Sequence, residues 1–110
     1  MMHLKLCKRI LCYVSGTLKY GLMYGRSEEL KLVGYCDSDW AGDVNDRKST
    51  TGFMFCFGDA AFTWCSKKQS IVALSTCEAE YIAAASCACH CIWLRRLCGC
   101  LLYTSDAADE

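Results

Sequence analysis

One long helical segment, from Ser75 to Cys98, is the most extended regular pattern in this sequence. Ser75 is a favourable N-cap residue, and Glu78, three residues later, completes a capping-box pattern. Arg95 and Arg96 suit the C-terminal end of a helix, where the helix dipole stabilises positive charge. The chain has 110 residues, of which 54% are apolar. This composition predicts one small domain with a real core and excludes a disordered chain.

Three short strand segments precede this helix. Residues 30–37 have the alternation of a strand. Residues 53–57 are apolar on both faces, as in a central buried strand, and residues 61–65 form the third segment. Gly58 and Asp59 have the composition of a hairpin turn between the last two. Because the links are short, we expect an antiparallel meander packed against the long helix.

The N-terminal part of the chain predicts one further helix. Within residues 4–14, Leu6, Ile10 and Val14 recur at helical spacing. Residues 18–24 then form a short strand candidate. Proline is absent from the whole chain, which fits a fold made of helices and paired strands.

The eleven cysteines are not those of a secreted disulfide scaffold. The N-terminus leads into a charged segment rather than a signal peptide. We therefore expect reduced, buried cysteines in an intracellular protein that is not secreted. The longest mostly apolar run, Ile82 to Leu94, is too short to span a membrane, which takes ~20 residues. The formal net charge is zero, so contact with nucleic acid requires a local basic patch.

Four aspartates fall within ten residues at the end of the first predicted strand: Asp37, Asp39, Asp43 and Asp46. They are compatible with a solvated polar loop, since aspartate is common in turns. A calcium loop starting at Asp37 fails at its fifth and twelfth positions, which are Ala41 and Lys48. A third interpretation is a nuclease that uses two magnesium ions, ~4 Å apart, held by carboxylates from different elements.

The long helix offers a second carboxylate for such a site. At ~100° per residue, the side chains that share the direction of Glu78 are those of Ile82, Ala85, Cys89, Ile92 and Trp93. Glu80 points to the opposite side, together with Cys87, Leu94 and Cys98. The bulkier side is expected to face the sheet, so Glu78 either shares a metal with Asp37 or only caps the helix; both interpretations stay open.

Other side chains carry alternative interpretations. Four basic residues either contact phosphates or form a solvated basic surface: Arg47, Lys48, Lys67 and Lys68. Trp64 and Trp93 are predicted to lie in the core rather than to stack on bases. A zinc site at Cys87, Cys89, His90 and Cys91 is disfavoured, because one helix does not point all four side chains at one ion.

Five motifs follow one another in order: residues 34–43, 46–52, 64–69, 75–83 and 92–96. Together they resemble the ribonuclease H domain of copia-type retrotransposon Pol polyproteins. Lys8 to Leu11 and Gly16 to Leu18 are similar to the stretch that joins the polymerase to that domain. The resemblance divides the chain into residues 1–29, a connection segment, and residues 30–99, the first half of a ribonuclease H domain. Residues 100–110 resemble a translated sequencing adapter, with a natural acidic tail as the alternative.

The resemblance implies an α+β fold, a partial ribonuclease H arrangement, and a nuclease function. Asp37 corresponds to the family's first-strand aspartate and Glu78 to its helix glutamate. Both would bind Mg²⁺ or Mn²⁺, and the substrate would be the RNA strand of an RNA–DNA hybrid. The partner would be the remaining Pol polyprotein, with its polymerase domain upstream, in the cytoplasm or a virus-like particle.

The family pattern continues into strands that carry a third and a fourth carboxylate, which are missing here. We therefore expect little or no cleavage by this chain alone. Two rival hypotheses are a non-catalytic remnant that binds hybrids and a Cys/His structural module that binds metal.

Overall fold

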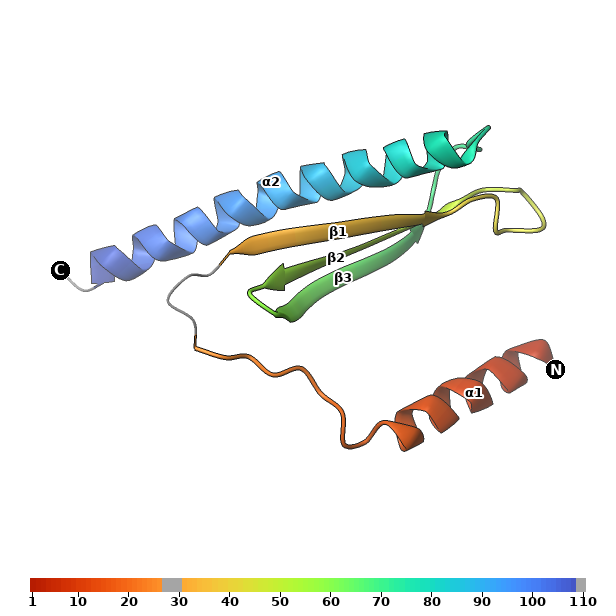
Figure 1. The fold of residues 1–110 in the computed structure, drawn as a ribbon, viewed down its shortest axis with the longest axis horizontal. Coiled ribbons are helices and arrows are strands. Elements are labelled where there is room, and N and C mark those ends of the chain that lie inside the picture. Colours follow the sequence, from red (N-terminus) through yellow and green to blue (C-terminus); the bar gives the residue numbers. More distant parts are fainter. Residues whose placement is uncertain (27–30, 109–110) are drawn as a thin grey trace.

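A computed structural model describes residues 1–26 and 31–108 of the chain. Its elements, in order, are α1 (Met2–Gly16), β1 (Leu32–Asp39), β2 (Thr50–Phe57), β3 (Ala60–Lys68) and α2 (Thr76–Ala108) (Figure 1). The predicted α+β class is confirmed, with a three-stranded antiparallel sheet and one long packed helix. The predicted boundary between residues 29 and 30 lies outside the described residues.

The three strands form the predicted meander, in the order β1-β2-β3. Gly58 lies in the two-residue turn between β2 and β3 with φ of +58°, a conformation that glycine adopts without strain. β2 and β3 are longer than the sequence indicated, whereas β1 is shifted by two residues toward the C-terminus. The pairing of β2 with β3 is irregular at Phe55 and Cys56. Thr50 and Lys68 end paired strands, so the polar flanks of the apolar segments also belong to the sheet.

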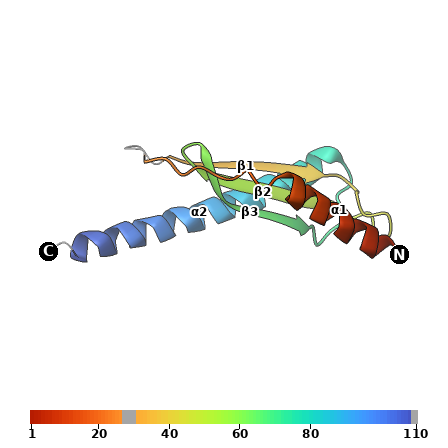
Figure 2. The same ribbon diagram turned by 90° about the horizontal axis from the view of Figure 1, so that it is seen from below.

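Helix α2 lies across β1 and β2 on one face of the sheet and projects beyond it toward the C-terminus (Figures 1 and 2). Phe55 is fully buried at the centre of this interface, where it packs with Cys87 and Leu94. Gly34 of β1 makes room for the Phe55 ring, because a Cβ at Gly34 would lie 2.6 Å from Phe55 Cε1. The core of the protein is therefore the layer between α2 and the first two strands.

The face of α2 that meets the sheet differs from the predicted one. Its buried residues are small or medium in size: Ala79, Ala83, Cys87 and Leu94. Ile92 and Trp93, expected to face the sheet, are more than half exposed. The prediction placed the bulkier side chains against the sheet. The sheet already presents phenylalanine rings, and small helix side chains pack against these rings more closely than large ones.

Two further burial predictions are wrong. Trp64 is 67% exposed and Trp93 is 55% exposed, so neither is a core residue. Of the cysteines in the described part of the chain, only Cys56 and Cys87 are buried. The sequence pattern predicted burial from hydrophobicity alone, whereas the core has room for few side chains beyond Phe55 and its neighbours.

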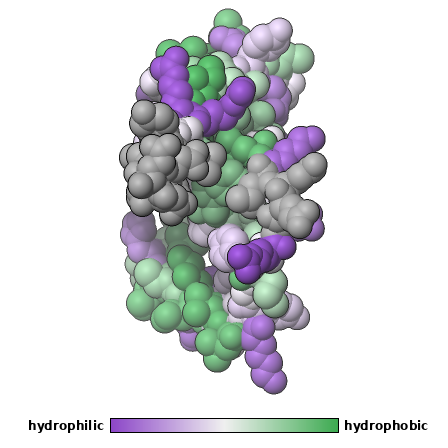
Figure 3. Space-filling model, turned by 90° about the vertical axis from the view of Figure 1, so that its left-hand side faces the viewer, coloured by the Kyte–Doolittle hydropathy of each residue, from purple (hydrophilic) through white to green (hydrophobic). Residues whose placement is uncertain are grey.

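Helix α1 makes no contact with the other described elements and buries none of its residues. Its apolar side chains stay on the surface, and green patches in the lower part of Figure 3 mark this N-terminal part of the chain. The strand expected at residues 18–24 is wrong, because this segment pairs with no strand. Tyr24 instead donates a hydrogen bond from its hydroxyl to the Ala61 carbonyl at 2.6 Å. None of the described helices combines the length and the apolar character needed to cross a membrane.

Replacing Gly34 by alanine tests the close packing of β1 against the core. Because the Phe55 ring is fully buried, it cannot swing away from the new methyl group. We expect Gly34→Ala to lower the free energy of unfolding by about 1–3 kcal/mol, measured by urea denaturation. The control is Gly99→Ala in α2, where a Cβ meets no atom within 4 Å and alanine favours the helix. Equal effects of the two substitutions would contradict this packing.

Candidate functional site

The end of β1 and the first turns of α2 are joined by a side-chain hydrogen bond. Ser38 donates from its hydroxyl to Glu80 Oε1 at 2.7 Å. Asp37 precedes Ser38 directly, is exposed, and accepts the Ser38 backbone N–H on Oδ1 at 2.9 Å. The structure therefore brings the carboxylate of Glu80 to the strand residue that follows Asp37.

Glu80 lies on the side of α2 that carries Cys87 and Leu94, as predicted, but this side faces the sheet rather than away from it. Because Ala79 and Ala83 face the sheet, Glu78 and Glu80 project ~100° to either side of that direction. This rotation of α2 turns Glu80 toward β1. The row of small residues at positions 79, 83 and 87 was the sequence signal that could have revealed it.

Glu78 has a different set of contacts. Its Oε2 accepts the Leu74 backbone N–H at 2.7 Å, and its own N–H donates to the Ser75 hydroxyl at 3.1 Å. Ser75 is therefore the N-cap that the sequence indicated, and the carboxylate of Glu78 binds a backbone N–H group just before the helix. One of its two oxygens is engaged in capping.

The remaining aspartates organise the loop between β1 and β2. Asp43 Oδ1 accepts the backbone N–H groups of Asn45 and Asp46. The ammonium of Lys68 lies 2.5 Å from Asp43 Oδ2 and 2.8 Å from Asp46 Oδ2. Hydrogen bonds from Lys68 and from the backbone lower the pKa of Asp43 to about 2. The same lysine lowers the pKa of Asp46, and both carboxylates raise the pKa of Lys68.

Two hydrogen bonds stabilise this loop, one to the segment before α2 and one between the two ends of the loop. Trp40 donates from its indole Nε1 to the Ala73 carbonyl at 3.0 Å, next to the start of α2. Ala41 has a φ of +51° and donates its N–H to the hydroxyl of Ser49, which is fully buried. A non-glycine residue in this region of backbone space is unusual, and the Ser49 contact supports it.

The strand register gathers the predicted basic residues at the end of the sheet that carries Asp37. Ser38 lies opposite Thr51, which lies opposite Lys67, and Asp39, Thr50 and Lys68 form the next row. Arg47 and Lys48 come from the loop that Lys68 binds, and the Arg47 N–H donates to the Asp43 carbonyl. Positive and negative side chains therefore share one end of the molecule, although the chain has no net charge.

Gln69 is a site residue that the sequence analysis did not single out. It is 5% exposed and follows β3. Its side-chain Nε2 donates to Thr51 Oγ1 and to the Ala79 carbonyl, both at 3.0 Å. Gln69 thereby ties the charged end of the sheet to α2 at the residue before Glu80.

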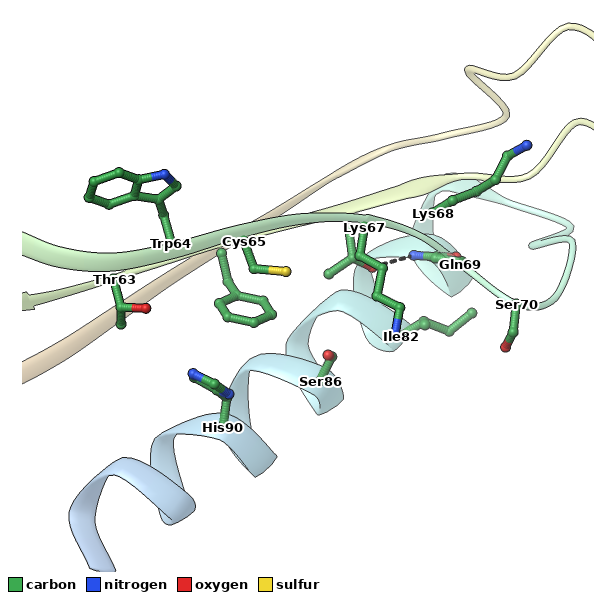
Figure 4. Close-up of a pocket in the computed structure, with 12 residues that line it drawn as sticks. Thr63, Trp64, Cys65, Lys67, Lys68, Gln69, Ser70, Ile82, Ser86 and His90 are labelled. Carbon is green, nitrogen blue, oxygen red and sulfur yellow. Dashed lines mark hydrogen bonds between the residues drawn. The ribbon is translucent and has the colours of Figure 1, made fainter. Parts of the chain in front are cut away.

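A groove of about 470 Å³ lies between β3 and α2 (Figure 4). Lys67, Ser86 and His90 line it, over an apolar floor that includes Phe53. Asp37, Glu78 and Glu80 are not among its lining residues. The groove is therefore a feature separate from these carboxylates.

The carboxylates suit magnesium in kind, since that ion prefers hard oxygen ligands. Their number is short: no three Asp, Glu, His or Cys side chains among the described residues are grouped so as to hold a metal ion. The same finding counts against the zinc alternative at residues 87–91. His90 instead packs against the rings of Phe53, Phe55 and Trp93, with centroids 5.1, 5.5 and 5.4 Å away.

The chain is similar in sequence to Pol polyproteins of transposons. It is 49% identical over 94 residues to the retrovirus-related Pol polyprotein from transposon TNT 1-94 of Nicotiana tabacum, which is 86% of this chain and 7% of the polyprotein. It is 40% identical over 92 residues to the Pol polyprotein from transposon RE1 of Arabidopsis thaliana, covering 84% of this chain and 6% of that one. Most of this chain is similar to a short segment of transposon Pol polyproteins.

Another relative has a different name. Secreted RxLR effector protein 161 of Plasmopara viticola is 46% identical over 92 residues, which is 84% of this chain and 65% of the effector. The chain thus spans just under two thirds of the effector and less than a tenth of the Pol polyproteins. No family model matches the chain. No solved structure matches it either. The relatives support the resemblance to Pol polyproteins.

The role of Lys68 in the loop can be tested through Asp43. We expect Lys68→Gln to raise the pKa of Asp43 from about 2 toward the ordinary value of 3.8. The folded-state pKa is the lowered one, so the ion pair stabilises the fold above pH ~3.8, and this contribution is lost as the pH falls toward 2. The measurement is an NMR titration of the side-chain carboxyl carbons. Lys67→Gln is the matched control, and an Asp43 pKa that stays near 2 in Lys68→Gln would contradict the assignment.

Proposed function

We propose that this chain is the first half of a ribonuclease H domain within a transposon Pol polyprotein. In the complete protein, this domain would hydrolyse the RNA strand of an RNA–DNA hybrid. The observation that carries the proposal is the hydrogen bond from Ser38 to Glu80, which ties a helix carboxylate to the end of the strand that bears Asp37. The order of the five sequence motifs and the similarity to Pol polyproteins support the same proposal.

Asp37 is the proposed strand ligand of the metal site, with Glu80 as its partner from α2. The sequence resemblance pointed to Glu78, but one oxygen of Glu78 caps the helix, whereas Glu80 reaches β1. Ser38 would orient Glu80, leaving the Glu80 Oε2 atom for a metal. When bound, Mg²⁺ or Mn²⁺ would supply an activated water and stabilise the charge on the leaving oxygen.

The basic residues at this end would bind the phosphates of the hybrid. Phosphate contacts position nucleic acid without reading its sequence, which suits an enzyme that cuts hybrids of any sequence. The charge of Lys68 is already offset by Asp43 and Asp46. Arg47, Lys48 and Lys67 are therefore the better candidates for contact with the substrate.

The chain by itself would cleave slowly or not at all, because its described residues contain no group of three metal-binding side chains. The absent carboxylates would come from the continuation of the polyprotein. The polymerase domain would precede this segment, and the complete protein would act in the cytoplasm or in a virus-like particle.

A second candidate function is hybrid binding without catalysis. The clustering of Arg47, Lys48 and Lys67 near the end of the sheet favours it, because phosphate binding needs only these cations. This function would be independent of magnesium, and its affinity would still fall steeply as the salt concentration rises.

One experiment separates the two functions. A fluorescently labelled RNA–DNA hybrid is titrated with the chain by anisotropy, with and without magnesium and at several salt concentrations. We expect magnesium to strengthen binding of the unmodified chain and to have no such effect on Asp37→Asn. Asp59→Asn is the control, since it removes an equal charge in the turn between β2 and β3. Magnesium-independent binding in all three proteins would favour the non-catalytic function, and cleavage that survives in Asp37→Asn would exclude Asp37 as a metal ligand.

A further inference from the structure

The thiols of Cys36 in β1 and Cys87 in α2 lie between these two elements. Cys36 directly precedes Asp37, the proposed metal ligand. Cys87 lies on the sheet-facing side of α2 and is 8% exposed. The thiol of Cys36 in β1 lies near enough to contribute to the raised pKa of the Cys87 thiol. The Sγ of Cys87 is also 3.4 Å from the position that a Cβ on Gly34 would occupy. This sulfur therefore lies directly over β1, between residues 34 and 36.

Small side chains separate the backbones of β1 and α2 in this part of the interface. Gly34 has no side chain, and Ala79 and Ala83 present only methyl groups, so Cα atoms of α2 and β1 approach within 8 Å. A disulfide links residues whose Cα atoms are up to ~7 Å apart.

The two thiols differ in accessibility. Cys36 is exposed, whereas Cys87 is buried. Burial, and then the neighbouring Cys36, raise the pKa of the Cys87 thiol, so it stays protonated and is a poor first target. Cys36 is accordingly the entry point for an oxidant, and Cys87 is placed to attack whatever forms on it.

We propose that Cys36 and Cys87 are a redox-sensitive pair that a small-molecule disulfide converts into an intramolecular disulfide. The Cys36 thiolate attacks one sulfur of the small disulfide, which forms a mixed disulfide and releases one small thiolate. Cys87 then loses its proton and attacks the Cys36 sulfur, which releases the second small thiolate. The protein loses two electrons and two protons, and the small disulfide is reduced to two thiols.

The new bond would lock α2 to β1 beside the carboxylates. Cys36 adjoins Asp37, and the Ser38–Glu80 hydrogen bond is two residues further along β1. The bond closes a loop of about 50 residues, which restricts the unfolded chain and so raises the urea concentration at the unfolding midpoint. The oxidised protein is therefore more stable, and its helix is fixed against the strand that bears Asp37.

The test is incubation of the folded chain with oxidised glutathione, followed by alkylation, digestion without reductant and tandem mass spectrometry. Trypsin leaves Cys36 as the only cysteine in the peptide of residues 32–47. In a variant with Cys77→Ser, Cys89→Ser and Cys91→Ser, Cys87 is the only cysteine in the tryptic peptide of residues 69–95. We expect these two peptides to be joined, with a mass two hydrogens below their sum and a raised urea midpoint that a reductant reverses.

Cys87→Ala supplies the complementary measurement, since it keeps a small side chain against the sheet. This variant should stop at the mixed disulfide and retain one glutathione on Cys36. The proposal would be overturned if the Cys36 peptide of the otherwise unmodified chain retained glutathione, or if it were joined to a peptide lacking Cys87. A comparison of the urea midpoints before oxidation checks that each variant is folded.

Discussion

The close packing of small side chains in α2 against β1 and β2 is the constraint on which the other features depend. Phe55 is fully buried beneath the helix and uses the space that Gly34 leaves open. With Ala79 and Ala83 against the sheet, the rotation of the helix is fixed. That rotation alone decides that Glu80 meets Ser38 and that Cys87 meets Cys36. A bulkier contact face would have changed both.

The order and type of the elements could be predicted from local patterns, because hairpin composition, strand alternation and helix capping are local properties. The face of α2 could not, because it depends on how much space the sheet leaves. The sheet contributes the rings of Phe53 and Phe55, so small side chains of α2, those of alanine and cysteine, fit against it. Ile92 and Trp93 remain exposed. The side of α2 that carries Glu80 was expected to face away from the sheet, and this was wrong for the same reason. The strand predicted at residues 18–24 did not form, because this segment pairs with no other strand.

The charged end of the sheet shows that a chain with no net charge can still have local clusters of positive and negative side chains. Asp43 and Asp46 hold Lys68, which shapes the loop and offsets that cation. The same end of the sheet carries Asp37 and Lys67, which the register of the strands places in neighbouring rows. Gln69 binds α2 at the residue before Glu80. Similarity to short segments of Pol polyproteins fits the proposed function, under which the remaining ligands would come from other parts of a longer chain.

Titration of the chain with magnesium, followed through the NMR signals of its side-chain carboxyl carbons, tests most directly the proposal that Asp37 and Glu80 bind one metal ion. We expect the Asp37 and Glu80 signals to shift together. Glu80→Gln should weaken the response of Asp37, whereas Glu78→Gln should leave it intact and reduce stability through loss of the cap. A response of Asp37 that survives in Glu80→Gln and disappears in Glu78→Gln would contradict this pairing.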